Sequence, residues 1–172
     1  MPKTVILGAA RTPFGKMGGA LASQDATDLG GTAIQAALDR AEVAPDQVEH
    51  VVFGQVLQAG QGQIPSRQAQ IKAGIPKEVS SETVNKVCAS GIRAAGMVDQ
   101  SIRAGDLHIA GLLHGGERGL GEGAELGRFA RLVLGNAEHH EILGTRGRRC
   151  IRLFVPGIDP ETEGKRPVAA RR

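Results

Sequence analysis

Residues 85–91 read Asn-Lys-Val-Cys-Ala-Ser-Gly and place a cysteine between an extended segment and a helix. The pattern predicts a strand over Ser81–Val87 and a helix that begins near Ser90. Cys88 would then meet the positive end of the helix dipole, where free N–H groups favour a thiolate over a thiol. Gly91 permits the close approach of a ligand or another backbone, and Ser90 is a candidate helix cap. The segment therefore indicates a thiol nucleophile, with a buried cysteine that packs as a small hydrophobe as the alternative.

Strands alternate with helices along the first 111 residues. Strands are expected over Thr4–Ala9, Val48–Phe53, Ser81–Val87 and Leu107–Ala110. Helices are expected over Asp25–Ala41, from Pro65 to a terminal Gly74, and over Ser90–Ala104. This βαβαβα order predicts an α/β fold in which right-handed crossovers join a mostly parallel sheet.

The composition changes near residue 111. Residues 1–111 carry five Lys, five Arg and ten Asp/Glu, whereas residues 112–172 carry one Lys, ten Arg and eight Asp/Glu. Glycines interrupt most windows after residue 114, and Pro156, Pro160 and Pro167 break the end of the chain. We therefore expect two parts, an α/β domain over 1–111 and an irregular or disordered Arg/Gly-rich tail over 112–172. A single helical turn over Glu138–Leu143 is the one regular feature that the tail suggests.

Arg, Gly and Ala are the residues that GC-rich codons yield when they are read out of frame. One hypothesis is that the tail, from about residues 107–112 onward, is a frameshift product. A genuine divergent tail is the alternative. The coding DNA distinguishes the two. If the tail is a frameshift product, the +1 or −1 frame past codon 111 should encode a continuation of the protein that the first 111 residues begin.

Several function classes receive no support from the sequence. No run approaches the roughly 20 apolar residues that cross a bilayer, so no membrane partner is expected. Two cysteines do not suggest a disulfide scaffold, and a reducing cytoplasmic location is expected. The basic cluster Arg146–Arg152 lacks aromatic companions in a chain without Trp or Tyr, which argues against nucleic-acid binding. His139-His140-Glu141 lacks the spacing of a helical zinc site, so no metal is expected.

Five segments in order give the chain a family resemblance. Asn85–Gly91 resembles the nucleophile segment of thiolases, the acyltransferases that make or cleave 3-ketoacyl thioesters of coenzyme A. Segments that also resemble the family are Ala10–Lys16, Gly54–Ala69, Ala73–Pro76 and Ile102–Asp106. The resemblance covers residues 1 to about 111 and then stops. It implies the amino-terminal half of a five-layered thiolase fold.

The resemblance also implies a chemistry. The cysteine that matches Cys88 attacks a thioester and holds the acyl group, and its own backbone N–H supports the oxyanion. Acyl-coenzyme A thioesters are then the substrates, and no bound cofactor or metal is expected. The connection that contains Gln63 and Arg67 contributes to the dimer interface in the family, so these residues are candidates for a homo-oligomer contact. A polar surface loop is the alternative.

Two parts of the family's apparatus are missing from this chain. Thiolases activate the cysteine with the histidine of a Gly-x-His-Pro turn and move a proton with the cysteine of a Cys-x-Gly loop. None of the five histidines precedes a proline, and Cys150 is followed by Ile-Arg. We therefore expect a truncated thiolase-type acyltransferase that is inactive alone. The alternative is a non-catalytic fragment able only to self-associate, through apolar surface left uncovered on the helix after Cys88. A basic binding module built on the tail is a third, remote reading.

Overall fold

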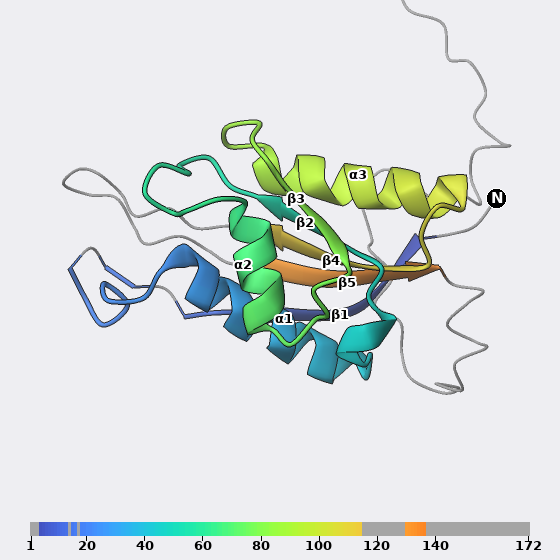
Figure 1. The fold of residues 1–172 in the computed structure, drawn as a ribbon, viewed down its shortest axis with the longest axis horizontal. Helices are drawn as coiled ribbons and strands as arrows, with labels where there is room; N and C mark the ends of the chain where they lie inside the picture. The colour runs from blue at the N-terminus through green and yellow to red at the C-terminus, as the bar shows by residue number, and fades with distance from the viewer. Residues whose placement is uncertain (1–3, 14, 17, 115–129, 137–172) are drawn as a thin grey trace, which may run out of the picture.

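The computed structural model describes residues 4–13, 15, 16, 18–114 and 130–136 (Figure 1). The strands in this part of the chain are β1 (Thr4–Arg11), β2 (His50–Gly54), β3 (Ser80–Val84), β4 (Ile109–His114) and β5 (Ala130–Asn136). The helices are α1 (Ala26–Ala41), α2 (Pro65–Lys72) and α3 (Ser90–Ala104), with a short 3₁₀ helix, η1 (Pro45–Gln47), before β2.

The strands form one sheet in the order β1-β5-β4-β2-β3. β2 pairs in parallel with both β3 and β4, so that Val52 lies opposite Glu82 on one side and Leu112 on the other. β5 lies antiparallel between β1 and β4. The expected α/β architecture with a mostly parallel sheet is confirmed.

β5 is the element that the sequence analysis did not predict. It comes from the segment after residue 112, for which no strand period was recognised, and it pairs with β1 over seven residue positions. Its apolar centre is only Leu132-Val133-Leu134, flanked by Arg131 and Gly135. Such a short apolar run is not enough to predict a strand from the sequence. The strand forms because it pairs with β1 on one side and β4 on the other.

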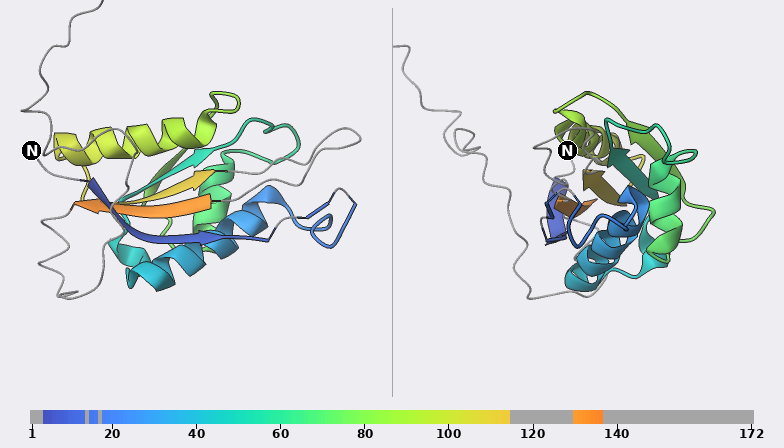
Figure 2. Two further views of the ribbon diagram at one scale, coloured as in Figure 1. Left: turned by 180° about the vertical axis from the view of Figure 1, so that it is seen from behind. Right: turned by 90° about the vertical axis from the view of Figure 1, so that its left-hand side faces the viewer.

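Helices cover both faces of the sheet, as a parallel sheet requires (Figure 2). On one face, α1 and α2 pack over the side chains of Val51 and Phe53. On the other face, α3 is the one helix of the described residues that packs over Val52, and its residues Ala94, Val98 and Ile102 are fully buried there. The alternation of Val51, Val52 and Phe53 between the two cores is the two-residue period of a strand buried on both sides.

The expected helix bounds agree closely with the structure, whereas the strands are displaced: β1 ends at Arg11, β2 begins at His50, and β4 spans Ile109–His114 where Leu107–Ala110 was expected. α1 follows Asp25 as its N-cap residue, α3 spans the predicted Ser90–Ala104, and Gly74 has the left-handed backbone (φ 80°) that suits a residue just past a helix. The third strand differs, because β3 ends at Val84 rather than at Val87. The last three residues of the expected strand, 85–87, belong instead to the turn that carries Cys88.

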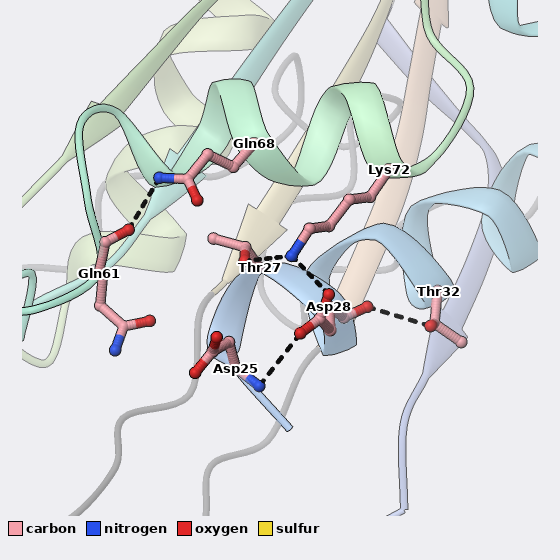
Figure 3. Close-up of polar contacts among 7 residues, drawn as sticks. All are labelled: Asp25, Thr27, Asp28, Thr32, Gln61, Gln68 and Lys72. Carbon is pink, nitrogen blue, oxygen red and sulfur yellow. Dashed lines mark hydrogen bonds and ion pairs between the residues drawn. The ribbon is translucent and has the colours of Figure 1, made fainter. Parts of the chain in front are cut away.

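A polar cluster joins α1 to α2 (Figure 3). The ammonium group of Lys72 donates to the hydroxyl of Thr27 at 2.9 Å and pairs with the carboxylate of Asp28. The hydrogen bond from Lys72 lowers the pKa of Asp28, and this outweighs the opposing effect of burial. The two charged side chains are each 40 % exposed, so solvent screens the pair.

Replacing Asp28 by asparagine is expected to cost about 0.5–1 kcal/mol of unfolding free energy at pH 7, within the range of screened surface pairs. Because the folded-state pKa is lowered, this contribution is present above the unfolded pKa of about 3.9 and is lost as the pH falls through the folded value. Urea unfolding between pH 7 and pH 3.5 measures the difference, with the exposed Asp46→Asn as control. A pH-independent difference would contradict the ion-pair account.

Candidate active site

Cys88 lies in the turn between β3 and α3, with an exposed thiol that forms no disulfide. Only Ala89 separates it from the first residue of α3, Ser90. The first N–H groups of a helix lack intrahelical acceptors and carry a partial positive charge, which favours an anion at this position. The placement of the thiol at the start of a fifteen-residue helix agrees with the expectation from the sequence.

Asn85 fixes the first half of this turn with both ends of its side-chain amide. Its Oδ1 accepts a hydrogen bond from the N–H of Val87 at 2.9 Å, which bends the chain out of the strand. Its Nδ2 donates to the carbonyl oxygen of Val56 at 3.0 Å. Since Val56 follows β2, this second bond attaches the cysteine turn to the connection between β2 and α2.

Ser90 fixes the second half of the turn from inside the protein. Its side chain is fully buried, and its Oγ accepts the N–H of Lys86 at 2.9 Å while it donates to the carbonyl oxygen of Val87 at 2.6 Å. The expectation that Ser90 caps α3 is therefore wrong in detail. Ser90 is the first helical residue, and its hydroxyl closes the preceding turn around Cys88 instead of accepting N–H groups of the helix.

The residue before the cysteine has a strained backbone. Val87 adopts φ 49°, in the left-handed region that β-branched residues rarely enter. Its side chain is 63 % exposed, so burial does not hold it there. The bonds from Asn85 and Ser90 impose the conformation, as expected where a structure fixes one residue at a reactive position.

The end of β2 forms the floor beneath the turn. A Cβ atom at Gly54 would lie 2.5 Å from the carbonyl carbon of Ser90 and 2.7 Å from the nitrogen of Gly91. The N–H of Gln55 donates to the carbonyl oxygen of Val84 at 3.0 Å, which joins β2 to the last residue of β3. The sheet and the helix thus meet at a position that only glycine fits, directly below the start of α3.

The other two predicted site residues lie away from Cys88. Gln63 is exposed in the connection before α2, and its carbonyl oxygen accepts a hydrogen bond from the side chain of Gln68 at 3.0 Å. The guanidinium of Arg67 donates to the carbonyl oxygen of Val79 at 3.0 Å. Val79 precedes β3 whereas Cys88 follows it, so the guanidinium of Arg67 points to the end of that strand opposite the cysteine, although the neighbouring Ser66 bonds to Thr83 near the end that leads to Cys88.

Several sequence features lie outside the described residues. These are Cys150, the His139-His140-Glu141 group, the Arg146–Arg152 cluster and the suggested turn at Glu138–Leu143. Within the ranges that the structure does describe, no group of three His, Cys, Asp or Glu side chains could hold a metal ion. No helix in those same ranges has the length and apolar character needed to cross a membrane.

Comparison with known families identifies the architecture. The family model for the thiolase N-terminal domain matches residues 4–146, most of the chain. The chain belongs to the thiolase family. This confirms the resemblance drawn from Asn85–Gly91, and the match runs past residue 111 to include β5, where the sequence analysis had ended the likeness.

Curated members of the thiolase family give the same result. The chain is 53 % identical over 109 residues to an acetyl-CoA acetyltransferase of Cupriavidus necator, and the aligned part covers 63 % of this chain and 28 % of that enzyme. It is 55 % identical over 108 residues to acetyl-CoA acetyltransferase 2 of Arabidopsis thaliana, over 62 % of this chain and 27 % of the relative. The chain therefore spans about 28 % of the length of such relatives.

A solved thiolase has a similar fold. The crystal structure of Acat5 thiolase from Ascaris suum in complex with coenzyme A matches with a TM-score of 0.65 and 36 % identity. The superposed part covers 66 % of this chain and 30 % of the other. The likeness places the sheet, with helices on both of its faces, among thiolases.

Two features of the site escaped the sequence analysis. These are the close approach of Gly54 to Ser90 and the two hydrogen bonds of the Asn85 side chain. One signal was available for the glycine, since it follows the buried apolar run Val51-Val52-Phe53, and a glycine at a strand end lets another backbone approach closely. No sequence signal pairs Asn85 with Val56, because that contact depends on the parallel packing of β2 and β3.

Proposed function

We propose that Cys88 is the acyl-accepting nucleophile of a thiolase-type acyltransferase acting on acyl-coenzyme A. The observation that carries the proposal is the exposed thiol on a strained, hydrogen-bonded turn at the start of α3. The curated relatives named acetyl-CoA acetyltransferases support the substrate class. The proposal places the reaction in the cytoplasm, where an exposed free cysteine stays reduced.

The first half-reaction is a transfer between two sulfur atoms. The thiolate of Cys88 attacks the thioester carbonyl, a new C–S bond forms, and the coenzyme A thiolate leaves with the electron pair of the broken C–S bond. The developing oxyanion needs donors that are already oriented. The hydrogen bonds of the turn use the N–H groups of Lys86, Val87, Ala89 and Ser90. Among the described residues, the N–H of Cys88 is not one of these donors, which supports its proposed role at the oxyanion.

We propose that this 172-residue polypeptide alone does not catalyse multiple turnovers of acyl-coenzyme A. Its sequence contains neither a Gly-x-His-Pro turn nor a Cys-x-Gly loop, the two elements that activate the cysteine and move the substrate proton in the family. Removing part of such an apparatus costs several orders of magnitude in rate. The acyl group would then reach Cys88 slowly and remain there, since no second group deprotonates an acceptor.

The second candidate function is self-association without catalysis. Large apolar side chains stand exposed on the described surface, among them Ile92 at 80 % and Val87 at 63 %. Exposed apolar surface of this kind favours association with a partner. Within this candidate, we propose that the dimer contact includes Gln63 and Arg67, because the matching connection lies at the dimer interface in the family. The intrachain bond from Arg67 to Val79 leaves the remaining guanidinium N–H groups for such a contact.

Incubation with acetyl-coenzyme A tests the first proposal. Intact mass and peptide mapping should show one acetyl group on Cys88, and the adduct should disappear in Cys88→Ala and persist in Cys150→Ala. Equal acetylation of Cys88 and Cys150 would show that Cys88 is an ordinary thiol and would refute its activation by the turn. A folded protein without any adduct would refute the nucleophile assignment.

A coupled assay tests the absence of turnover. The pure protein should cleave acetoacetyl-coenzyme A no faster than the Cys88→Ala variant does. Acylation of Cys88 alone does not regenerate the free thiol, so no catalytic cycle is completed. Robust cleavage that is lost in Cys88→Ala would overturn this part of the proposal. It would also show that the described residues, with the tail, supply the missing acid and base.

A further inference from the structure

The amino ends of β2 and β3 bring three polar side chains together. His50 is the first residue of β2 and lies opposite Ser80, the first residue of β3, while Val52 lies opposite Glu82. Side chains two positions apart in a strand lie on the same face of the sheet. Since Val52 packs against α3, the side chains of His50, Ser80 and Glu82 all lie on the α3 face.

The imidazole of His50 joins the other two side chains. Its Nδ1 lies 2.7 Å from Oγ of Ser80, and its Nε2 lies 3.2 Å from Oε1 of Glu82. An ionised carboxylate can only accept hydrogen bonds, so Nε2 carries the hydrogen in this contact. In the neutral ring Nδ1 is then the acceptor, and the hydroxyl of Ser80 donates to it. Glu82 thereby sets the tautomer in which His50 can remove a proton from Ser80.

The three side chains differ in their access to solvent. The side chain of His50 is 19 % exposed and that of Glu82 is 44 % exposed, while Ser80 belongs to the exposed residues. The ring is therefore largely held within the protein, whereas a reagent can reach the serine from solvent. A hydroxyl within about 2.6–3.2 Å of a base that a third group orients is the general signature of an activated nucleophile.

We propose that these residues form a second acyl-transfer site, in which Ser80 is the nucleophile, His50 is the base and Glu82 is a positioning residue. The site takes small esters with a good leaving group, because an exposed serine suits a substrate whose leaving group departs without a general acid. The cluster lies at the amino end of β3, whereas Cys88 follows the carboxyl end of that strand. The proposal is therefore independent of the role of Cys88.

The reaction is a transfer between two oxygen atoms followed by hydrolysis. Oγ of Ser80 attacks the ester carbonyl and forms a new C–O bond while its proton passes to Nδ1 of His50. The C–O bond of the ester breaks, and the alcohol or phenol oxygen leaves with its electron pair and later takes up the proton from the ring. Water then attacks the acyl-serine, His50 accepts a proton from the water, and the carboxylic acid leaves as Ser80 regains its hydrogen.

The place of β3 in the sheet provides donors to the oxyanion. β3 is the last strand of the described sheet, next to β2. The outer edge of such a strand presents backbone N–H groups that are not used by a neighbouring strand. Groups of this kind, fixed in place by the fold, can stabilise the negative oxygen that develops when Ser80 attacks.

Hydrolysis of p-nitrophenyl acetate tests the nucleophile. The full chain with Cys88→Ala and Cys150→Ala serves as the starting protein, so that thiols do not contribute and the outcome is separate from acylation of Cys88. Release of p-nitrophenolate should fall at least fivefold in Ser80→Ala. It should be unchanged in Ser81→Ala, a matched control because Ser81 is the next residue of β3 and lies on the other face. A rate that Ser80→Ala leaves unchanged overturns the proposal, and loss in His50→Gln alone would then show that the imidazole itself attacks the ester.

Chemical rescue tests the roles of the base and the positioning residue. Imidazole in solution should restore part of the rate in His50→Gly, beyond its own reaction with the ester, and none in Ser80→Ala. Glu82→Gln keeps an oxygen that accepts from Nε2, so it should retain more of the rate than Glu82→Ala. Equal rates in both Glu82 variants and the starting protein refute the role of Glu82, and the absence of rescue refutes that of His50. Circular dichroism melting confirms that each variant folds, and His50→Gln replaces His50→Gly as the loss-of-base variant where the glycine unfolds the strand.

Discussion

Replacing Gly54 by alanine should destabilise the chain and slow acetylation of Cys88 at least tenfold. The new Cβ would lie 2.5 Å from the carbonyl carbon and 2.6 Å from the carbonyl oxygen of Ser90. These are backbone atoms at the start of α3, so no side-chain rotation relieves the clash. Overpacking in a close-packed interior costs about 1–3 kcal/mol or more, and the relief here would shift the turn that carries the thiol.

Gly111→Ala provides a matched control for this prediction. Gly111 is buried in β4 opposite Val51 of β2, and its added Cβ would lie 3.6 Å from a methyl group of Val51, an ordinary contact distance. Urea unfolding and the rate of acetyl transfer from acetyl-coenzyme A should separate the two variants. Equal and small effects from both changes would show that Gly54 is dispensable and that α3 is not seated on β2 as described.

The local signals in the sequence were sufficient for most of the elements. A helix was expected over Ser90–Ala104, and the structure gives the same bounds, with Gly105 in a left-handed conformation at φ 87° just past its end. The strand before Cys88 was predicted three residues too long. Thr83, Val84 and Val87 all favour strands, and nothing local shows that the amide of Asn85 competes for the N–H of Val87.

β5 could not be predicted from local sequence. Its neighbours, β1 and β4, are long-range partners, and β1 lies more than one hundred residues earlier in the chain. A run of three apolar residues between an arginine and a glycine gives little intrinsic strand preference, so the pairing decides the structure. The origin of the tail in a shifted reading frame stays a prediction, which the coding DNA can check.

The candidate site was predicted in part. A cysteine between a β-branched run and a helix, together with the family resemblance, indicated a candidate nucleophile, and the structure places that cysteine, exposed, just before α3. The support beneath it comes from residues 36 and 29 positions away, in the approach of Gly54 to Ser90 and the bond from Asn85 to Val56. Contacts of this kind follow from the parallel packing of β2 against β3 and α3, which no short window of sequence contains.

Ser90→Ala should remove about 1–3 kcal/mol of unfolding free energy and reduce the rate of Cys88 acetylation several-fold. The hydroxyl is fully buried and joins two backbone groups of the turn, the N–H of Lys86 and the carbonyl of Val87. Alanine leaves the N–H of Lys86 without its acceptor in a partly buried turn, while the carbonyl of Val87 keeps only the N–H of Ser90, and an unpaired group costs more than the net value of a hydrogen bond. It also releases Val87 from φ 49°, so the turn should relax toward an extended conformation.

Ser101→Ala separates this effect from the general cost of losing a hydroxyl in α3, because Ser101 is only half-buried in the same helix. Its expected change in unfolding free energy is within about 0.5 kcal/mol, and its acetylation rate should match the unsubstituted chain. The decisive comparison is Ser90→Ala combined with Val87→Gly, because glycine adopts a positive φ without strain. Partial recovery of the acetylation rate in the double variant would show that Ser90 acts by holding the backbone before Cys88. No recovery would mean that the hydroxyl stabilises the turn without setting the conformation of Val87.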